Sequence, residues 1–174
     1  QTSELFFENF KVPIENILGE QGKGHVIVMN GLDSERAMIA PICLGISERA
    51  LDISVEYSKI REQFGKPISK FQGISFKLAE MATEIEASKM LLFKAASKML
   101  SNSKDANYHS AIAKFKASEV AVSVANDAVQ IFGGYGYSKE YPVEKFYRDS
   151  KLSTIGEGTS EIQKLVISRA LLNN

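Results

Sequence analysis

The sequence predicts an all-α protein: an up-down four-helix-type bundle with an extra C-terminal helix, preceded by a short β-strand segment. Three observations support this prediction. Apolar residues recur every three or four positions over three long stretches, short polar or glycine-containing turns separate the stretches, and a run with period two precedes them. The chain has 174 residues, of which 44% are hydrophobic, so it can bury a core.

The front segment, residues 4–12, is predicted to be a strand. Phe6, Phe10 and Val12 lie on one side of it at period two, and Pro13 ends the run. Because a lone strand is not stable, we expect it to be the last strand of a sheet whose other strands are absent from this chain. The chain also lacks an initiator Met, so we interpret it as a piece of a longer protein.

The first long helix is predicted to follow Gly24 and to stop at Gly65 and Pro67. The second helix is predicted to open at Ser69-Lys-Phe-Gln72, which has the S-x-x-Q form of a capping box. On this interpretation, all prolines of the chain fall at element boundaries.

The third helix follows a polar turn at residues 101–105. It has apolar residues on two sides, so we expect it to be buried between neighbouring helices. Glycines within residues 133–136 interrupt it. A short helix ending at about Asp149 and a last helix over residues 160–172 complete the predicted bundle.

Composition excludes several classes of protein. Lys and Arg number 21, as do Asp and Glu, and a net charge of zero argues against a nucleic-acid-binding module. No apolar run approaches the roughly 18 residues of a membrane span. Cys43 is the only cysteine and His25 is far from His109, so neither a disulfide framework nor a metal site is predicted. One reduced cysteine is compatible with a bacterial cytoplasm or a mitochondrial matrix.

The strongest candidate for chemistry is Glu157, which lies between Gly156 and Gly158 just before the last helix. Glycines let the backbone approach a ligand closely, a helix start offers free N–H groups, and a Glu on such a turn can act as a general base. The alternative is an ordinary helix N-terminus, in which an acid is favoured and Ser160-x-x-Gln163 forms a capping box.

Other interruptions of the bundle pattern also suggest a site. Arg61 could bind phosphates and Phe64 could lie against a planar ring, or they could mark only a helix C-terminus. The glycines of Gln130-Ile-Phe-Gly-Gly134-Tyr-Gly136 could let a pyrophosphate approach the backbone, or they could be a plain helix stop. The charged residues of Leu32-Asp33-Ser34-Glu35-Arg36 form either a solvated face or, if buried, part of a site.

In their order and spacing, these motifs resemble the acyl-CoA dehydrogenase family over the whole chain. The matching motifs are Asn16-Ile-Leu-Gly-Glu20, Leu32-Asp33-x-Glu-Arg36, Arg61-x-Gln-Phe-Gly65, Phe71-Gln72, Gln130-x-Phe-Gly-Gly134-x-Gly136, Arg148-Asp149 and Gly158-Thr-Ser-Glu-Ile-Gln163. The resemblance implies that residues 1–20 are the end of a middle β domain and a linker. It implies that residues 21–174 are the C-terminal helical bundle domain.

The resemblance implies a flavoprotein that uses FAD to oxidise an acyl-CoA thioester to the trans-2-enoyl-CoA. In this family a Glu removes the α proton, the β hydrogen leaves as hydride to flavin N5, and the electrons pass to electron-transfer flavoprotein. Different members carry the base at two positions, which correspond here to Glu157 and Glu35. The resemblance favours Glu157, whose motif matches the majority form in full, and leaves Glu35 as the alternative. Two carboxylates facing one substrate carbon repel, so one is expected to hold a proton or turn away.

The resemblance also implies cofactor and substrate residues. Those matching FAD-contacting positions are Arg61, Gln63, Phe64, Phe71, Gln72, Gln130, Gly133, Gly134, Thr159 and Glu161. Those matching substrate positions are Asp33 and Arg36, near the CoA moiety, and Gly158, beside the thioester. Several of the FAD contacts cross subunits in the family, which implies a homo-oligomer, commonly a dimer of dimers.

One position departs from the straight-chain members, which often have Tyr directly before the base. Gly156 stands there in this chain, as in isovaleryl-type enzymes, and it leaves room for a branched acyl group. Two rival functions remain open. The same fold could serve an acyl-CoA oxidase or another flavoenzyme, or the chain could be a catalytically silent helical interaction module.

Overall fold

The computed structural model describes residues 3–172, apart from the side chains of residues 33 and 34. The chain divides into two compact units, Gln1–Gly31 and Leu32–Asn174. The first unit holds a 3₁₀ helix, η1 (Ile14–Asn16), and the start of the first long helix.

Residues 4–12 form no strand in this structure. A strand needs a second strand for its backbone hydrogen bonds, and the described residues offer none to this segment. Its large apolar side chains, including Phe6 and Phe10, are exposed. The prediction of a strand over residues 4–12 is therefore wrong for the chain in this structure.

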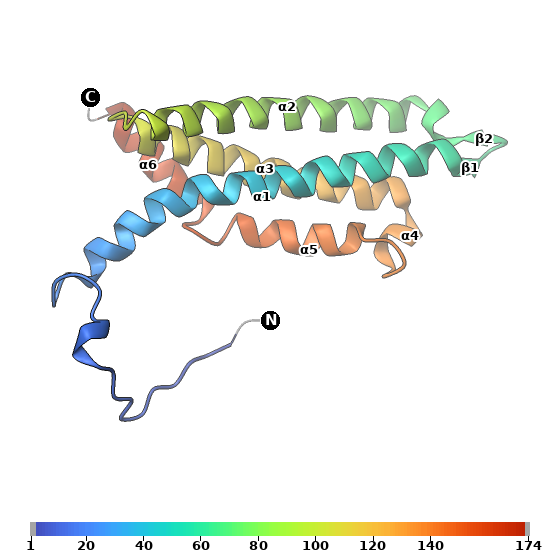
Figure 1. The fold of residues 1–174 in the computed structure, drawn as a ribbon. Coiled ribbons are helices and arrows are strands. Elements are labelled where there is room, and N and C mark those ends of the chain that lie inside the picture. Colours follow the sequence, from blue (N-terminus) through green and yellow to red (C-terminus); the bar gives the residue numbers. More distant parts are fainter. Residues whose placement is uncertain (1–2, 173–174) are drawn as a thin grey trace. The chain divides into compact units, whose positions relative to one another are not determined.

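The second unit is a helical bundle, which confirms the predicted fold class (Figure 1). Its long helices are α1 (Gly24–Ile60), α2 (Gln72–Leu100) and α3 (Ala106–Phe132), followed by α4 (Gly134–Tyr137), α5 (Val143–Ser153) and α6 (Ser160–Leu172). Helix α3 packs against α2, α4, α5 and α6, as expected for a helix that is apolar on two sides. None of the helices in the described part of the chain is both long and apolar enough to cross a membrane.

The core lies along α3 and has two parts. The larger cluster joins α1, η2, α2, α3 and α5 through the buried side chains of Ala50, Ile53, Tyr57, Ile68, Met81, Ile85, Val120, Val124, Ala128, Ile131, Phe132 and Val143. Burying one such aliphatic or aromatic side chain contributes about 1.5–3 kcal/mol. The smaller cluster contains only small residues, Ala40, Cys43, Ala95, Ala113, Ala117 and Ala121, and they let α1, α2 and α3 approach closely.

The connection between α1 and α2 is a short hairpin rather than a simple loop. Strand β1 (Glu62–Gln63) pairs antiparallel with β2 (Lys66–Pro67), and a second 3₁₀ helix, η2 (Ile68–Lys70), follows. Both residues of the hairpin turn have positive φ, 52° at Phe64 and 77° at Gly65. This is the backbone pattern of a two-residue type I′ turn, whose twist matches that of paired strands.

Two local predictions were wrong. Ser69 does not cap α2, because it lies inside η2; the helix instead starts after Phe71 without a side-chain cap. Pro41 does not mark a boundary, since it lies within α1. The helix continues through it because the neighbouring Ala40 and Cys43 are fully buried against the bundle.

Candidate functional site

The turn before α6 holds its carboxylate in a strained conformation. Glu157 has a φ of 55° and Gly158 a φ of 89°, so two consecutive residues lie in the left-handed region. For a residue with a side chain this region costs of order 1–3 kcal/mol, and it persists only where the surroundings enforce it. The backbone at Glu157 must therefore be fixed by its neighbours.

Two fully buried side chains fix this turn. Lys114 of α3 donates a hydrogen bond from Nζ to the Gly158 carbonyl at 2.7 Å. Gln163 of α6 donates from Nε2 to the same carbonyl at 2.9 Å and to the Glu157 carbonyl at 3.3 Å. A Cβ at position 158 would lie 2.8 Å from Gln163 Nε2, so only glycine leaves room for this contact.

The side chain of Glu35, on α1, contacts the side chain of Glu157. The hydrogen bond between its carboxyl and that of Glu157 raises the pKa of Glu157, and so do desolvation and the negative charge of Glu35. The nearby Lys114 ammonium partly opposes this rise. Because two neighbouring negative charges repel, the contact favours the protonated form of Glu157. A half-buried carboxyl whose pKa is raised is a stronger base than an ordinary glutamate.

The capping-box interpretation of the α6 start is wrong. The hydroxyl of Thr159 accepts a hydrogen bond from the Ile162 N–H at 3.3 Å and caps the helix. Ser160 instead donates to Glu119 of α3 at 2.6 Å, and Gln163 is committed to the turn. Ser160 thus connects the start of α6 to α3, and Gln163 connects α6 to the turn that precedes it.

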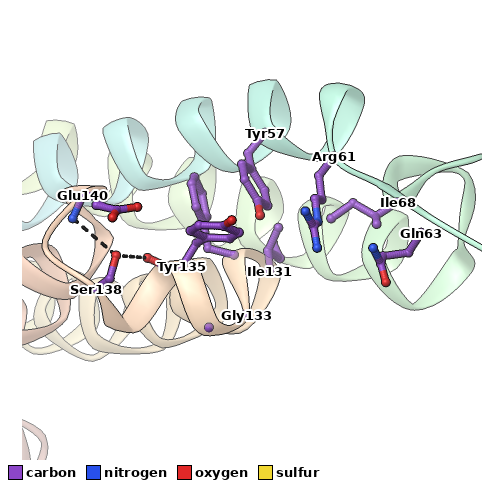
Figure 2. Close-up of a pocket in the computed structure, with 11 residues that line it drawn as sticks. Tyr57, Arg61, Gln63, Ile68, Ile131, Gly133, Tyr135, Ser138 and Glu140 are labelled. Carbon is purple, nitrogen blue, oxygen red and sulfur yellow. Dashed lines mark hydrogen bonds between the residues drawn. The ribbon is translucent and has the colours of Figure 1, made fainter.

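A second group of predicted residues surrounds a cavity of about 590 Å³ at the other end of α3. Arg61 and Gln63 line it from the end of α1 and the hairpin, and Gly133, Gly134 and Tyr135 line it from the start of α4 (Figure 2). The Arg61 guanidinium lies 5.7 Å from the centre of the Tyr135 ring. The cavity therefore combines a cation, an amide, an aromatic ring and bare backbone.

The two glycines in this cavity leave space for a bound group. A Cβ at Gly133 or Gly134 would meet no other atom within 4 Å, so the open space beside the backbone is accessible to a ligand. Gly133 also ends α3 with a φ of 61°. A diphosphate could approach the backbone here while the Arg61 guanidinium binds it through charge-assisted hydrogen bonds. The residues present therefore fit the diphosphate part of FAD.

Phe64 extends this surface outward. It is 93% exposed at the tip of the hairpin, and its ring meets that of Phe71 edge-on at 6.1 Å. Lys66 lies over the Phe71 ring at 4.4 Å. An aromatic side chain held outward in a left-handed conformation is positioned to contact something other than its own bundle.

The two groups of residues are far apart within one chain. At about 1.5 Å of rise per residue, Lys114 and Gln130 lie roughly 24 Å apart along α3. Glu157 and Gly158 are at the Lys114 end, whereas Arg61 and Gly133 are at the other end. The structure does not bring the candidate base and this cavity together in one small site.

The remaining predicted residues are placed as follows. Gln72 and Gln130 are exposed, and Arg36 is buried with its Nη1 3.4 Å from Asn107 Oδ1. The side chain of Asp33 lies outside the part of the chain that the structure describes. The backbone N–H of Glu161 and the Thr159 hydroxyl hydrogen-bond to the Glu161 carboxyl and lower its pKa.

Sequence reasoning missed Lys114, which has no exposed surface. The spacing in the sequence could have indicated its burial. Lys114 lies four residues after the buried Ser110 and four before the buried Ser118, and so on the core-facing side of α3. Tyr135 was also missed as a wall of the cavity, although it lies between two glycines of a noted motif.

Comparison with known proteins shows which family the sequence matches. Residues 22–172 match the family described as "Acyl-CoA dehydrogenase, C-terminal domain". The short-chain-specific acyl-CoA dehydrogenase of Megasphaera elsdenii is 55% identical over 99% of this chain and 45% of its own length. A caffeyl-CoA reductase–Etf complex subunit of Acetobacterium woodii is 48% identical over 98% of this chain and 45% of its own length.

A solved structure gives the same result for the fold. The butyryl-CoA dehydrogenase of Megasphaera elsdenii superposes with a TM-score of 0.89 at 54% identity, covering 95% of this chain and 43% of that one. The chain thus spans less than half the length of these relatives. The family match over most of the sequence, together with the shared fold, shows that the chain belongs to the acyl-CoA dehydrogenase family and corresponds to its C-terminal domain.

Proposed function

We propose that the protein containing this chain catalyses the FAD-dependent α,β-dehydrogenation of an acyl-CoA thioester to the trans-2-enoyl-CoA, with Glu157 as the base. The observation that carries the proposal is the strained turn at Glu157, which two buried side chains hold in place beside a second carboxyl. Strain of this kind is concentrated at functional sites, because an ordinary helix start has no need of it.

Each group of the turn has a part in the chemistry. The Glu157 carboxylate removes the proton from the α carbon, and its raised pKa makes it a stronger base than a free carboxylate. The Glu157 N–H donates a hydrogen bond to the thioester oxygen, where negative charge develops as the proton leaves. Gly158 lets Gln163 approach the turn closely enough to hold it in this conformation. FAD, when bound, supplies the acceptor for the hydride that leaves the β carbon.

Glu157 is the better candidate for the base because of its place on the turn. A base must lie within hydrogen-bond reach of the proton that it removes, and the same turn supplies the N–H that polarises the thioester. Glu35 belongs to the regular part of α1 and has no comparable backbone donor beside it. Its role in the proposal is to raise the pKa of Glu157, whose carboxyl it contacts.

The distance between the two ends of α3 supports a homo-oligomer. In this proposal, the cavity at Arg61 and Gly133 and the exposed Phe64 bind the FAD of a neighbouring copy, while Glu157 and Thr159 serve the FAD of their own copy. The electron acceptor is electron-transfer flavoprotein, and the names of two similar proteins refer to such a complex or to an electron-transferring flavoprotein. The names of other relatives favour a short acyl chain as the substrate.

The test uses the complete protein with its flavin. A panel of straight and branched acyl-CoA thioesters is mixed with the enzyme without oxygen, and flavin reduction is followed by absorbance. Replacing Glu157 by Gln should lower the rate of reduction by about 10²- to 10⁴-fold, the usual contribution of a general base. Replacing Glu35 by Gln should leave most of the activity. The reverse pattern would identify Glu35 as the base.

Two further readouts address the rival functions. Oxygen consumption during turnover with an acyl-CoA, in the absence of electron-transfer flavoprotein, would identify an oxidase. Absence of bound flavin from the purified complete protein would favour the silent helical module.

A further inference from the structure

Lys114 is unusual for the position that it occupies. It lies in the first third of α3 with no exposed surface, although transferring an ammonium group into a protein interior is costly. Burial lowers its pKa accordingly. An apolar side chain here would complete the apolar side of α3 without this cost, so packing alone does not explain a lysine.

The hydrogen bond that Lys114 donates indicates a role in holding the turn at Glu157 and Gly158. Its Nζ lies 2.7 Å from the Gly158 carbonyl oxygen, which Gln163 Nε2 also contacts at 2.9 Å. Gln163 by itself would satisfy this carbonyl and would add no charge to the interior. What Lys114 adds is a positive charge and a second restraint on the peptide that follows Gly158.

The charged and titratable groups around this position come from three elements. Glu35, Arg36 and Cys43 belong to α1, Glu119 belongs to α3, and Glu157 belongs to the turn. Glu35 acts on Glu157 in the direction that favours a protonated carboxyl, whereas the Lys114 ammonium acts in the opposite direction. Glu119 also accepts a hydrogen bond from Ser160, which fixes it beside the start of α6.

We propose that Lys114 is a positioning residue for the Glu157 base: it holds the Glu157–Gly158 turn through the Gly158 carbonyl and places a positive charge beside the Glu157 and Glu35 carboxyls. This inference rests on the proposed function, because it assigns Lys114 a role in the same proton abstraction. The ammonium itself does not touch the substrate. It acts by restraining the backbone at Gly158, next to the base, and its positive charge offsets the repulsion between the two carboxyls.

Three substitutions separate these two effects. Lys114→Met removes both the charge and the hydrogen bond, Lys114→Gln keeps a donor without the charge, and Lys114→Arg keeps both. Lys116→Met is the matched control, since Lys116 lies on the same helix but forms an exposed ion pair with Glu84. All variants are made in the complete flavin-containing protein.

Activity gives the first readout. We expect Lys114→Met to lower kcat by about 10- to 100-fold, the loss that a small misplacement of a catalytic group produces, with little change in the Kd of acyl-CoA. The acidic limb of its pH–rate profile should move to higher pH. In a Glu157→Gln background the same substitution should have no further effect on kcat, because Lys114 acts through Glu157. Lys114→Arg should restore most of the rate.

An infrared titration gives the second readout, which needs no turnover. The protonated carboxyl band that Glu157→Gln removes reports the titration of Glu157. This midpoint should rise in Lys114→Met and Lys114→Gln and remain unchanged in Lys116→Met. If Lys114→Met does not fold, Lys114→Gln carries the test. The inference is overturned if the neutral variants that fold keep the wild-type midpoint.

The two readouts keep this inference distinct from the proposed function. A complete protein that oxidises no acyl-CoA would contradict the proposed function, whereas the infrared titration would still show whether Lys114 controls the ionisation of Glu157. A protein that is active, but whose activity and Glu157 titration are the same in Lys114→Met and Lys116→Met, would contradict only the role of Lys114.

Discussion

The carboxyl of Glu35 on α1 and the carboxyl of Glu157 on the turn before α6 are hydrogen-bonded to each other. This contact joins residues that are distant in the sequence, and it is the largest cause of the raised pKa of Glu157. Glu157 therefore binds a proton at a higher pH than an ordinary glutamate would.

The first prediction concerns pH. A base works in its ionised form, so the rate falls as pH decreases through the pKa of Glu157, which is raised above its usual value. Replacing Glu35 by Gln removes the principal cause of that rise, and the acidic limb of kcat/KM should move to lower pH. Glu48→Gln, on the same helix but paired with Lys89 at 2.8 Å, should leave the limb in place. An unchanged limb in the Glu35 variant would contradict the coupling of the two carboxyls.

The second prediction concerns the space at Gly158. In Gly158→Ala the new Cβ would lie 2.8 Å from Gln163 Nε2, and the residue would keep a φ of 89° that alanine disfavours. We expect a loss of about 1–3 kcal/mol in the stability of the turn and a fall in kcat of at least tenfold. Thermal unfolding and single-turnover flavin reduction measure the two effects.

Gly45→Ala is the control for that substitution. Gly45 lies within α1, and a Cβ there would meet nothing within 4 Å, so the change should be neutral or stabilise the helix by about 0.5–1 kcal/mol. Equal losses of activity in the two variants would argue against a specific role for Gly158.

The third prediction concerns the hairpin tip. If Phe64 contacts the FAD of a neighbouring copy, Phe64→Ala should weaken flavin binding by about tenfold, equivalent to ~1.4 kcal/mol, without unfolding the bundle. The ratio of flavin to protein after dialysis and the Kd for added FAD measure this effect. Phe93→Ala, which removes an exposed aromatic side chain from α2, should retain the flavin. Loss of flavin from both variants would instead indicate general damage to the assembly.

The fourth prediction concerns Gly156. A Cβ there would lie at an ordinary contact distance of 3.6 Å from the Leu152 carbonyl, and Gly156 is not among the described residues with positive φ. The fold therefore accepts a side chain at this position. Gly156→Tyr should lower kcat/KM for isovaleryl-CoA relative to butyryl-CoA by about tenfold, with the Tm nearly unchanged. A ratio that does not change would remove the argument for a branched substrate.

Much of the bundle could be predicted from the sequence because helix periodicity is a local signal. The last helix was predicted over residues 160–172 and is Ser160–Leu172 in the structure. The end of α1 was placed too late, at Gly65, because the positive φ of Phe64 depends on pairing across the hairpin. The helix predicted to stop at about Asp149 continues to Ser153, whose hydroxyl bonds the Ser150 carbonyl at 2.6 Å.

The site could be predicted only in part, for a related reason. Sequence motifs predicted Glu35, Glu157 and Arg61 as site residues. The contacts of these side chains depend on how helices that are distant in the sequence pack together. Lys114 was missed because a lysine within a helix usually belongs to a solvated face, and only its zero exposure reveals that it is part of the core. The resemblance to a family indicated which residues belong to the site, whereas the three-dimensional structure showed which groups they contact.

The small-residue cluster between α1, α2 and α3 has a practical consequence for measurement. Cys43 is fully buried in it, and burial raises the pKa of its thiol despite the nearby Ser153 and Lys114. Such a thiol reacts with alkylating reagents only when the helices around it separate. In the described part of the chain it is the one free cysteine, so its labelling rate would measure how often the bundle opens near Lys114 and Ser153.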